Sequence, residues 1–225
     1  MAKIKICGLF RQEDICSVNE AAPDYAGFVF APQSRRFIDP LRAANLREGL
    51  DPAIIPVGVF VRAKIEEITA LYRDGIIAMV QLHGGETGEY AAALRERCDA
   101  PIIRAFNAGD LQTPSGLSWY KPAGADYLLL DHGSGGTGQS FDWKLLDMPQ
   151  NPAPQGDTNC PPQSPVPFFL AGGIGLHNID RALDCRPYGV DISSGAETDG
   201  VKDREKMLRL VERVRSFHDG QREGP

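Results

Sequence analysis

Short apolar runs recur along almost the whole chain, and most of them are followed by a segment with apolar residues at helical spacing. Each run is about as long as a strand that is buried on both faces. Glycine, proline or polar residues mark the boundaries between them. The pattern predicts eight strands, at residues 3–6, 25–30, 54–60, 78–82, 102–106, 127–130, 168–170 and 188–192.

The segments between these runs predict helices. Their apolar residues return every three or four positions, and the final helix has the clearest apolar face, with Met207, Leu210 and Val214. Prolines and glycines allow at most a short helix after the fifth strand, and residues 148–167 are so rich in proline that we expect a mobile surface loop there. The predicted helices are 11–22, 40–50, 62–73, 86–97, 178–183 and 203–217, with one or two further turns at 142–146.

Strict alternation of strands and helices implies parallel strands joined by crossover connections. Eight such units in this length predict an α/β fold, a single closed (β/α)8 TIM barrel. The alternative is a doubly wound open sheet, which more often has fewer strands and a phosphate loop after its first strand. This chain has only Cys7-Gly8-Leu9 at that point. We therefore predict one barrel domain at 1–217 and a flexible C-terminal tail at 218–225.

The composition of the chain argues against nucleic-acid and membrane partners and bears on where the protein works. Hydrophobic residues make up 42% of the 225-residue chain, the formal net charge is −6, and no block of lysine or arginine stands out. These features argue against a nucleic-acid partner, and no apolar run is long enough to cross a membrane. The N-terminus shows no signal peptide. Five cysteines, an odd number without a CxxC pair, favour a reducing cytoplasmic location.

The strand C-termini of a barrel meet at one face, where active sites are built. The stretch 127–143 combines two features suited to that face. Its apolar run ends at Asp131, and a loop rich in glycine and hydroxyl groups follows, with backbone N–H groups that could approach an anion. A capped strand end with a flexible loop is the alternative interpretation of this stretch.

The loops after the last two strands predict a phosphate site. Gly172 and Gly173 follow the seventh strand, and Ser193, Ser194 and Gly195 follow the eighth. These are the strands that usually hold phosphate in this fold, and the residues offer backbone N–H groups and hydroxyls with little side-chain bulk. A pair of tight turns would have similar residues, but two such turns at both expected strands favour phosphate binding.

Cys7 and Asp131 end the first and sixth strands, on different sides of a closed barrel, so their side chains can face each other across the mouth. A thiolate can accept a proton and a carboxylic acid can donate one. The pair would need a Cys7 pKa lowered by cations or N–H groups, and a carboxyl group that burial keeps protonated. Taken singly, Cys7 could be a small buried apolar residue and Asp131 a cap.

Further polar residues stand at other strand ends. Arg36 follows the second strand and suits bidentate carboxylate binding, although a solvated surface arginine is the alternative. Gln81, His83 and Asp191 are further candidates for substrate contacts, and His83 could equally be structural. Histidine, cysteine and acidic residues form no cluster with metal-ligand spacing, so we predict no metal and no cofactor.

With these residues identified, the sequence resembles the phosphoribosylanthranilate isomerases of tryptophan biosynthesis. The resemblance covers the chain from Lys5 to about Asp203, and its strength lies in eight short motifs in the right order. These are KICG at 5–8, GFVF at 27–30 with SRR at 34–36, GVF at 58–60, VQLHG at 80–84, LLLD at 128–131, GGTG at 135–138 with FDW at 141–143, LAGG at 170–173 and DISSG at 191–195.

The resemblance implies that Cys7 is the general base, Asp131 the general acid and Arg36 the residue that binds the anthranilate carboxylate. It implies phosphate binding by the two glycine- and serine-containing loops. The reaction is an Amadori rearrangement of N-(5-phosphoribosyl)anthranilate, which needs no metal or organic cofactor. The chain departs from the family pattern at Ala196, where the family usually has valine, and in the length of its 148–167 loop.

Two other functions stay open at this stage. A bifunctional isomerase acting on both tryptophan- and histidine-pathway substrates is one, but related barrels of that kind usually end the first strand in Asp rather than Cys. A non-catalytic phosphate-binding barrel is the other, and the presence of both Cys7 and Asp131 argues against it. The expected partner is a small phosphorylated substrate, and both a monomer and a homodimer fit the sequence.

Overall fold

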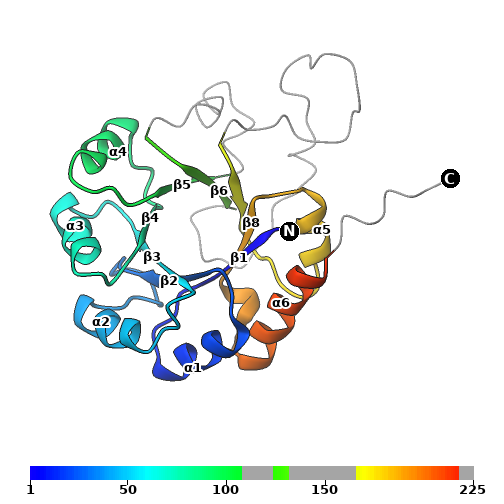
Figure 1. Cartoon of the computed structure of the whole chain (residues 1–225). Coiled ribbons are helices and arrows are strands. Elements are labelled where there is room, and N and C mark those ends of the chain that lie inside the picture. The colour runs from blue at the N-terminus through cyan, green and yellow to red at the C-terminus, as the bar shows by residue number, and fades with distance from the viewer. Residues whose placement is uncertain (108–123, 132–165, 218–225) are drawn as a thin grey trace, which may run out of the picture.

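The eight predicted strands form a closed parallel barrel in the computed structural model, which describes residues 1–107, 124–131 and 166–217 (Figure 1). Each strand pairs with the next along the chain, and β8 closes the barrel against β1. The predicted fold class is therefore confirmed. The strands are β1 (Lys3–Cys7), β2 (Tyr25–Val29), β3 (Ile55–Phe60), β4 (Met79–Leu82), β5 (Ile102–Asn107), β6 (Tyr127–Asp131), β7 (Phe168–Leu170) and β8 (Gly189–Ile192).

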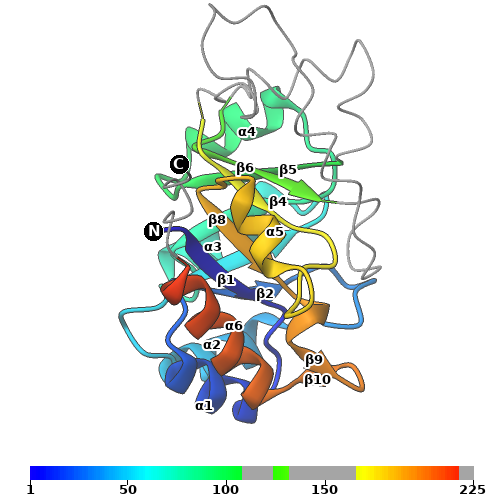
Figure 2. The same ribbon diagram turned by 90° about the vertical axis from the view of Figure 1, so that its right-hand side faces the viewer.

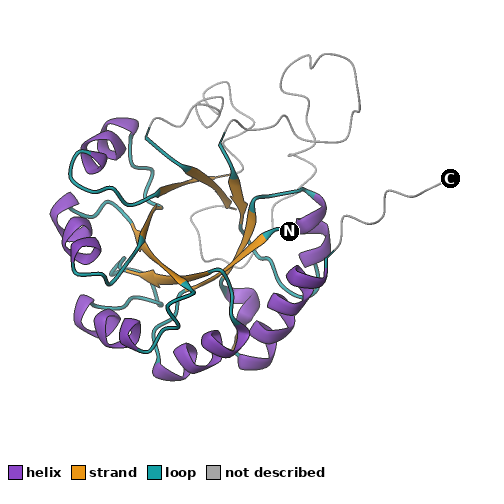
Figure 3. Ribbon diagram, in the orientation of Figure 1, coloured by secondary structure: helices purple, strands orange, loops and turns teal. Residues whose placement is uncertain are grey.

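Helices cover the outside of this barrel (Figure 3). Within the described residues they are α1 (Gln12–Ala21), α2 (Pro40–Glu48), α3 (Ile65–Arg73), α4 (Gly88–Arg95), α5 (Ile179–Asp184) and α6 (Arg204–Ser216). Five of the six lie inside predicted helical segments, and α5 extends one residue beyond the predicted 178–183. The predicted turns at 142–146, most of the proline-rich segment 148–167 and the tail at 218–225 lie outside the described residues. No helix in the described part of the chain is long and apolar enough to span a membrane.

Alternating side chains explain why the strands bury both faces. Ile4 and Ile6 of β1 point outward, and they belong to the same buried cluster as Met207, Leu210 and Val214 of α6. These five side chains are at most 1% exposed. Helix α6 is thereby fixed against the strand that ends in Cys7, as the apolar face of its sequence predicts.

Aromatic rings fill the N-terminal end of the barrel interior. The hydroxyl groups of Tyr25 and Tyr188 lie 2.9 Å apart, and the ring of Phe169 packs edge-on against both tyrosine rings. Val57, Met79 and other apolar side chains complete this layer. Because the N-terminal end is packed, open space in the interior is left toward the strand C-termini.

A short hairpin after β8 was not predicted. Ser194–Ala196 forms a 3-10 helix, and β9 (Glu197–Thr198) and β10 (Val201–Lys202) then pair antiparallel. Asp199 and Gly200 between them have φ values of 51° and 84°, the positive values that a two-residue type I′ turn requires. Figure 2 shows the hairpin at the end of the barrel toward which β1 runs. The hairpin therefore lies beside the barrel mouth.

Candidate active site

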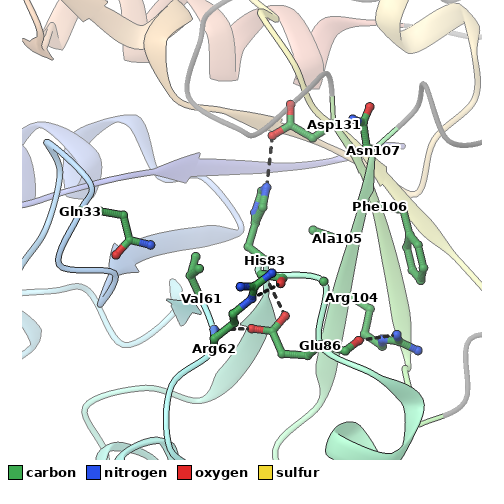
Figure 4. A pocket seen from close by; sticks show the side chains of 12 residues that line it. Gln33, Val61, Arg62, His83, Glu86, Arg104, Ala105, Phe106, Asn107 and Asp131 are labelled. Carbon is green, nitrogen blue, oxygen red and sulfur yellow. Dashed lines mark hydrogen bonds and ion pairs between the residues drawn. The ribbon is translucent and has the colours of Figure 1, made fainter.

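A cavity of about 500 Å³ opens at the strand C-termini. Polar residues from five strands or the loops after them reach it, and apolar side chains of β2 and β3 line the rest. It gathers seven of the residues singled out from the sequence: Cys7, Arg36, Gln81, His83, Asp131, Asp191 and Ser193. A neighbouring cavity of about 590 Å³ shares His83 and Asp131 with it and extends toward Arg104 and Phe106 (Figure 4).

Cys7 ends β1 with only 7% of its surface exposed, among apolar side chains of β2 and β3. Gly27 on β2 leaves room for the thiol, because a Cβ atom there would lie 2.8 Å from the Cys7 Sγ. Burial raises the pKa of the Cys7 thiol, and the positive charge of Lys5 counteracts only part of this effect. The expected lowering of the Cys7 pKa is therefore wrong for this structure, although a cation does act in the expected direction.

Lys5 is a buried cation that the sequence interpretation missed. Its side chain is fully buried inside the barrel, and its Nζ donates to Asp191 Oδ1 at 2.9 Å. Burial alone would lower the pKa of Lys5, but the combined effect of Asp191 and Cys7 outweighs it and the pKa is raised. The signal was present in the order Lys3-Ile4-Lys5-Ile6-Cys7, because alternate residues of a strand share a face and Lys5 must therefore point to the same side as Cys7.

Asp131 ends β6 and faces His83, whose Nε2 lies 3.4 Å from Asp131 Oδ2 (Figure 4). The amide nitrogen of Gln81 lies 2.8 Å from Nδ1 of the same imidazole. In this orientation of the Gln81 amide its nitrogen donates, so Nδ1 accepts and the ring carries its proton on Nε2, facing Asp131. Gln81 and His83 thus orient a hydrogen-bond donor toward the predicted acid.

Arg36 is buried and faces Glu197 of the hairpin. Its Nε and Nη2 donate to the two Glu197 carboxylate oxygens at 2.7 and 3.1 Å. Lys202 and Arg35 donate to the same carboxylate, at 2.7 and 2.5 Å. Burial opposes ionisation of Glu197, but these donors prevail and lower its pKa to about 2. One edge of the Arg36 guanidinium is therefore occupied within the protein. Sequence reasoning missed Glu197 and Lys202 together with the hairpin.

The predicted phosphate residues lie on two loops that touch each other. A Cβ atom at Gly195 would lie 1.9 Å from the Ile174 carbonyl oxygen, so only glycine allows the loops to approach this closely. Gly172 and Gly173 have φ values of 88° and 61°, which favour glycine. The hydroxyl of Ser193 donates to the Cys7 carbonyl oxygen at 3.1 Å. Of the predicted phosphate residues, the cavity lining includes Ser193 and not Gly172, Gly173, Ser194 or Gly195.

A metal centre finds no support in the part of the chain that the structure describes, where no three or more histidine, cysteine or acidic residues gather as a metal site. The chemistry available in the cavity is that of a thiol, two carboxyl groups, an imidazole and a guanidinium group, with the Lys5 ammonium buried beside it. The fold and this site together define a (β/α)8-barrel enzyme of the acid–base type.

Comparison with known proteins gives the family. The model of the N-(5'-phosphoribosyl)anthranilate (PRA) isomerases matches residues 4–213. The chain belongs to this family. A curated relative from Endomicrobium trichonymphae, an N-(5'-phosphoribosyl)anthranilate isomerase, is 44% identical over 96% of this chain and 100% of its own. The expected family resemblance is therefore confirmed.

Solved structures agree with this assignment. The phosphoribosyl anthranilate isomerase of Thermus thermophilus superposes with a TM-score of 0.80 at 33% identity, covering 96% of this chain and all of that one. A second phosphoribosyl anthranilate isomerase was solved with reduced 1-(o-carboxyphenylamino)-1-deoxyribulose 5-phosphate. It has a TM-score of 0.76 at 29% identity, and the match covers 96% of this chain and all of that one.

Proposed function

We propose that this chain catalyses the Amadori rearrangement of N-(5-phosphoribosyl)anthranilate to 1-(2-carboxyphenylamino)-1-deoxyribulose 5-phosphate, a step of tryptophan biosynthesis. The observation that carries the proposal is the meeting of Cys7 and Asp131, from β1 and β6, in one cavity at the barrel mouth. The reaction needs an acid at the ring oxygen and a base at C2 of the sugar. These two side chains supply both groups.

The chemistry can be followed atom by atom. The Asp131 carboxyl group donates its proton to the ring oxygen as the C1–O bond breaks, and the nitrogen lone pair forms the C1=N bond of an iminium ion. The Cys7 thiolate takes the C2 proton, and the C2–H electrons form the C1=C2 bond of an enolamine. A proton then adds to C1 and the C2 hydroxyl loses one, which gives the ketose and restores both side chains.

The remaining site residues bind substrate in this proposal. Arg36 binds the anthranilate carboxylate through the edge of its guanidinium that Glu197 does not use. Gln81, His83 and Asp191 contact the sugar. The phosphate binds at the loops after β7 and β8, where Gly172, Gly173, Ser193, Ser194 and Gly195 lie. We also propose that the enzyme works in the cytoplasm, in line with its odd number of cysteines.

A fluorescence assay of the purified protein tests the function, because substrate loses the fluorescence of its anthranilate group on conversion. Turnover of N-(5-phosphoribosyl)anthranilate supports the proposal, and binding of product without turnover would identify a non-catalytic barrel instead. The aminoaldose of the histidine pathway should be converted poorly. Comparable rates with both substrates would replace the proposal by a bifunctional isomerase.

A further inference from the structure

A buried ion pair lies directly beneath the predicted base. Lys5 and Asp191 are register partners on the adjacent strands β1 and β8, and their charged atoms lie 2.9 Å apart in the barrel interior. The side chain of Lys5 is 0% exposed and that of Asp191 is 8% exposed. Asp191 lines the same cavity as Cys7. The mechanism described so far makes no use of Lys5.

Stability alone gives a weak reason for this pair. Buried ion pairs lose much of their attraction to the cost of removing both charges from water, and well-packed apolar residues often serve equally well. The layer nearer the N-terminal end of the barrel is filled in that way, by Val57, Met79 and Phe169. An ammonium group placed two residues before the base on the same face of β1 therefore calls for a role in the chemistry of that base.

We propose that Lys5 is a positioning residue for Cys7: its buried ammonium group, held in place by Asp191, stabilises the thiolate form of the base. Lys5 acts on the substrate only through Cys7. The proposal deepens the function given above, since it rests on Cys7 as the base of that reaction.

The charges around Cys7 support Lys5 in this role. The charged groups that act on the thiol are Lys5 on β1, Asp191 on β8 and Lys202 on β10, and the positive charge of Lys5 favours the thiolate. Arg36, His83 and Asp131 share the cavity. The Lys202 ammonium is bound by Glu197 at 2.7 Å and by the Ser193 carbonyl oxygen at 3.0 Å. Lys5 has the larger effect of the two cations in favouring the thiolate.

The test measures how fast iodoacetamide alkylates Cys7 between about pH 6 and pH 11, with the Cys7 peptide followed by mass spectrometry in the absence of substrate. Only the thiolate reacts, so the midpoint of the rate–pH curve reports its formation. Lys5→Met should move this midpoint up by about one to three pH units, because an oppositely charged neighbour has an effect of that size. The acidic limb of kcat/KM should move in the same direction.

Two further variants separate this role from a structural one. Lys5→Met leaves the buried Asp191 carboxylate without its partner. The double variant Lys5→Met/Asp191→Asn removes both charges, and its alkylation midpoint should still lie above that of the wild type. Lys3→Met is the matched control, because Lys3 lies on the same strand and binds Asp24 at 2.8 Å but is 44% exposed. It should keep the wild-type midpoint.

The proposal is overturned if folded Lys5→Met/Asp191→Asn keeps the wild-type midpoint, or if Lys3→Met moves it as far. Circular dichroism establishes folding, and Lys5→Gln/Asp191→Asn serves as a second neutral pair if the first does not fold. Failure of the isomerase proposal would look different. In that case Lys5→Met would still move the alkylation midpoint, while Cys7→Ala would leave turnover of the anthranilate substrate intact.

Discussion

The two sides of the cavity differ in how their charges are held. On the base side, Lys5 and Asp191 lie on adjacent strands and form a buried ion pair beneath Cys7. On the acid side, Asp131 on β6 is separated from His83, just beyond β4, by the intervening strand β5. The distance between His83 Nε2 and Asp131 Oδ2 is longer, 3.4 Å, and the His83 side chain is 21% exposed. Strand pairing thus holds the charged groups beneath the base, whereas the neighbour of the acid is more exposed to solvent.

The largest expected effect comes from removing either reacting group. Cys7→Ala should lower kcat by about 10²- to 10⁴-fold, and Asp131→Asn should do the same, because each removes one proton-transfer step. Product affinity, measured by isothermal titration calorimetry, should change little in both variants. Since burial raises the Cys7 pKa, wild-type kcat/KM should keep rising with pH through the neutral and mildly alkaline range as more thiolate forms.

A third variant tests whether the base side needs a thiol or only its shape. Cys7→Ser keeps the shape of the thiol and should be almost as inactive as Cys7→Ala, because a hydroxyl group ionises far less readily. A Cys7→Ala or Asp131→Asn enzyme with near-wild-type kcat would remove that residue from the chemistry.

The next effect concerns substrate affinity. Arg36→Met should raise KM by roughly 10- to 100-fold, the range expected for hydrogen bonds to a charged group, with a smaller change in kcat. A substrate analogue without the anthranilate carboxylate should bind the wild type poorly and should not distinguish it from the variant. If the variant loses affinity equally for both compounds, Arg36 does not bind the carboxylate.

The smallest effect is on stability. The Glu197 pKa of about 2 lies below its ordinary value of 4.5. Its ionised form therefore stabilises the fold above about pH 4.5, and this contribution is lost as the pH falls toward 2. Glu197→Gln should unfold at a lower urea concentration than the wild type at pH 7, because its free energy of unfolding should be smaller by about 1–3 kcal/mol. This difference in free energy should shrink below about pH 4. The exposed Glu48→Gln is the control, and a pH-independent difference would contradict the role of the Glu197 charge.

Much of the fold could be predicted because strand and helix periods are local. The apolar runs gave all eight strands, and residues at their ends, such as Cys7 and Asp131, follow from the rule that parallel strands bring their C-termini to one face. Local patterns do not show which distant residues contact each other in the fold. The bond from Arg36 to Glu197 joins residues 161 positions apart, and nothing near either residue in the sequence indicates it.

Lys5 and the hairpin are hard to predict for other reasons. A charged residue in an apolar run is rarely fully buried unless it is paired, and the partner of Lys5, Asp191, is distant in sequence. The strands β9 and β10 have two residues each, too few for an alternating pattern. The Asp199-Gly200 turn was the available signal. The raised Cys7 pKa could not be predicted, since it depends on how completely the surrounding strands bury the thiol.

In the proposed reaction, Cys7 and Asp131 act on one substrate from opposite sides of the mouth. A crystal structure of this chain with reduced 1-(o-carboxyphenylamino)-1-deoxyribulose 5-phosphate would show both contacts at once. We expect the Cys7 sulfur beside C2 of the sugar chain, and the Asp131 carboxyl group within hydrogen-bond reach, about 2.6–3.2 Å, of the C4 oxygen that closes the substrate ring. A carboxyl group turned away from that oxygen, or a C2 atom out of reach of the thiol, would contradict it.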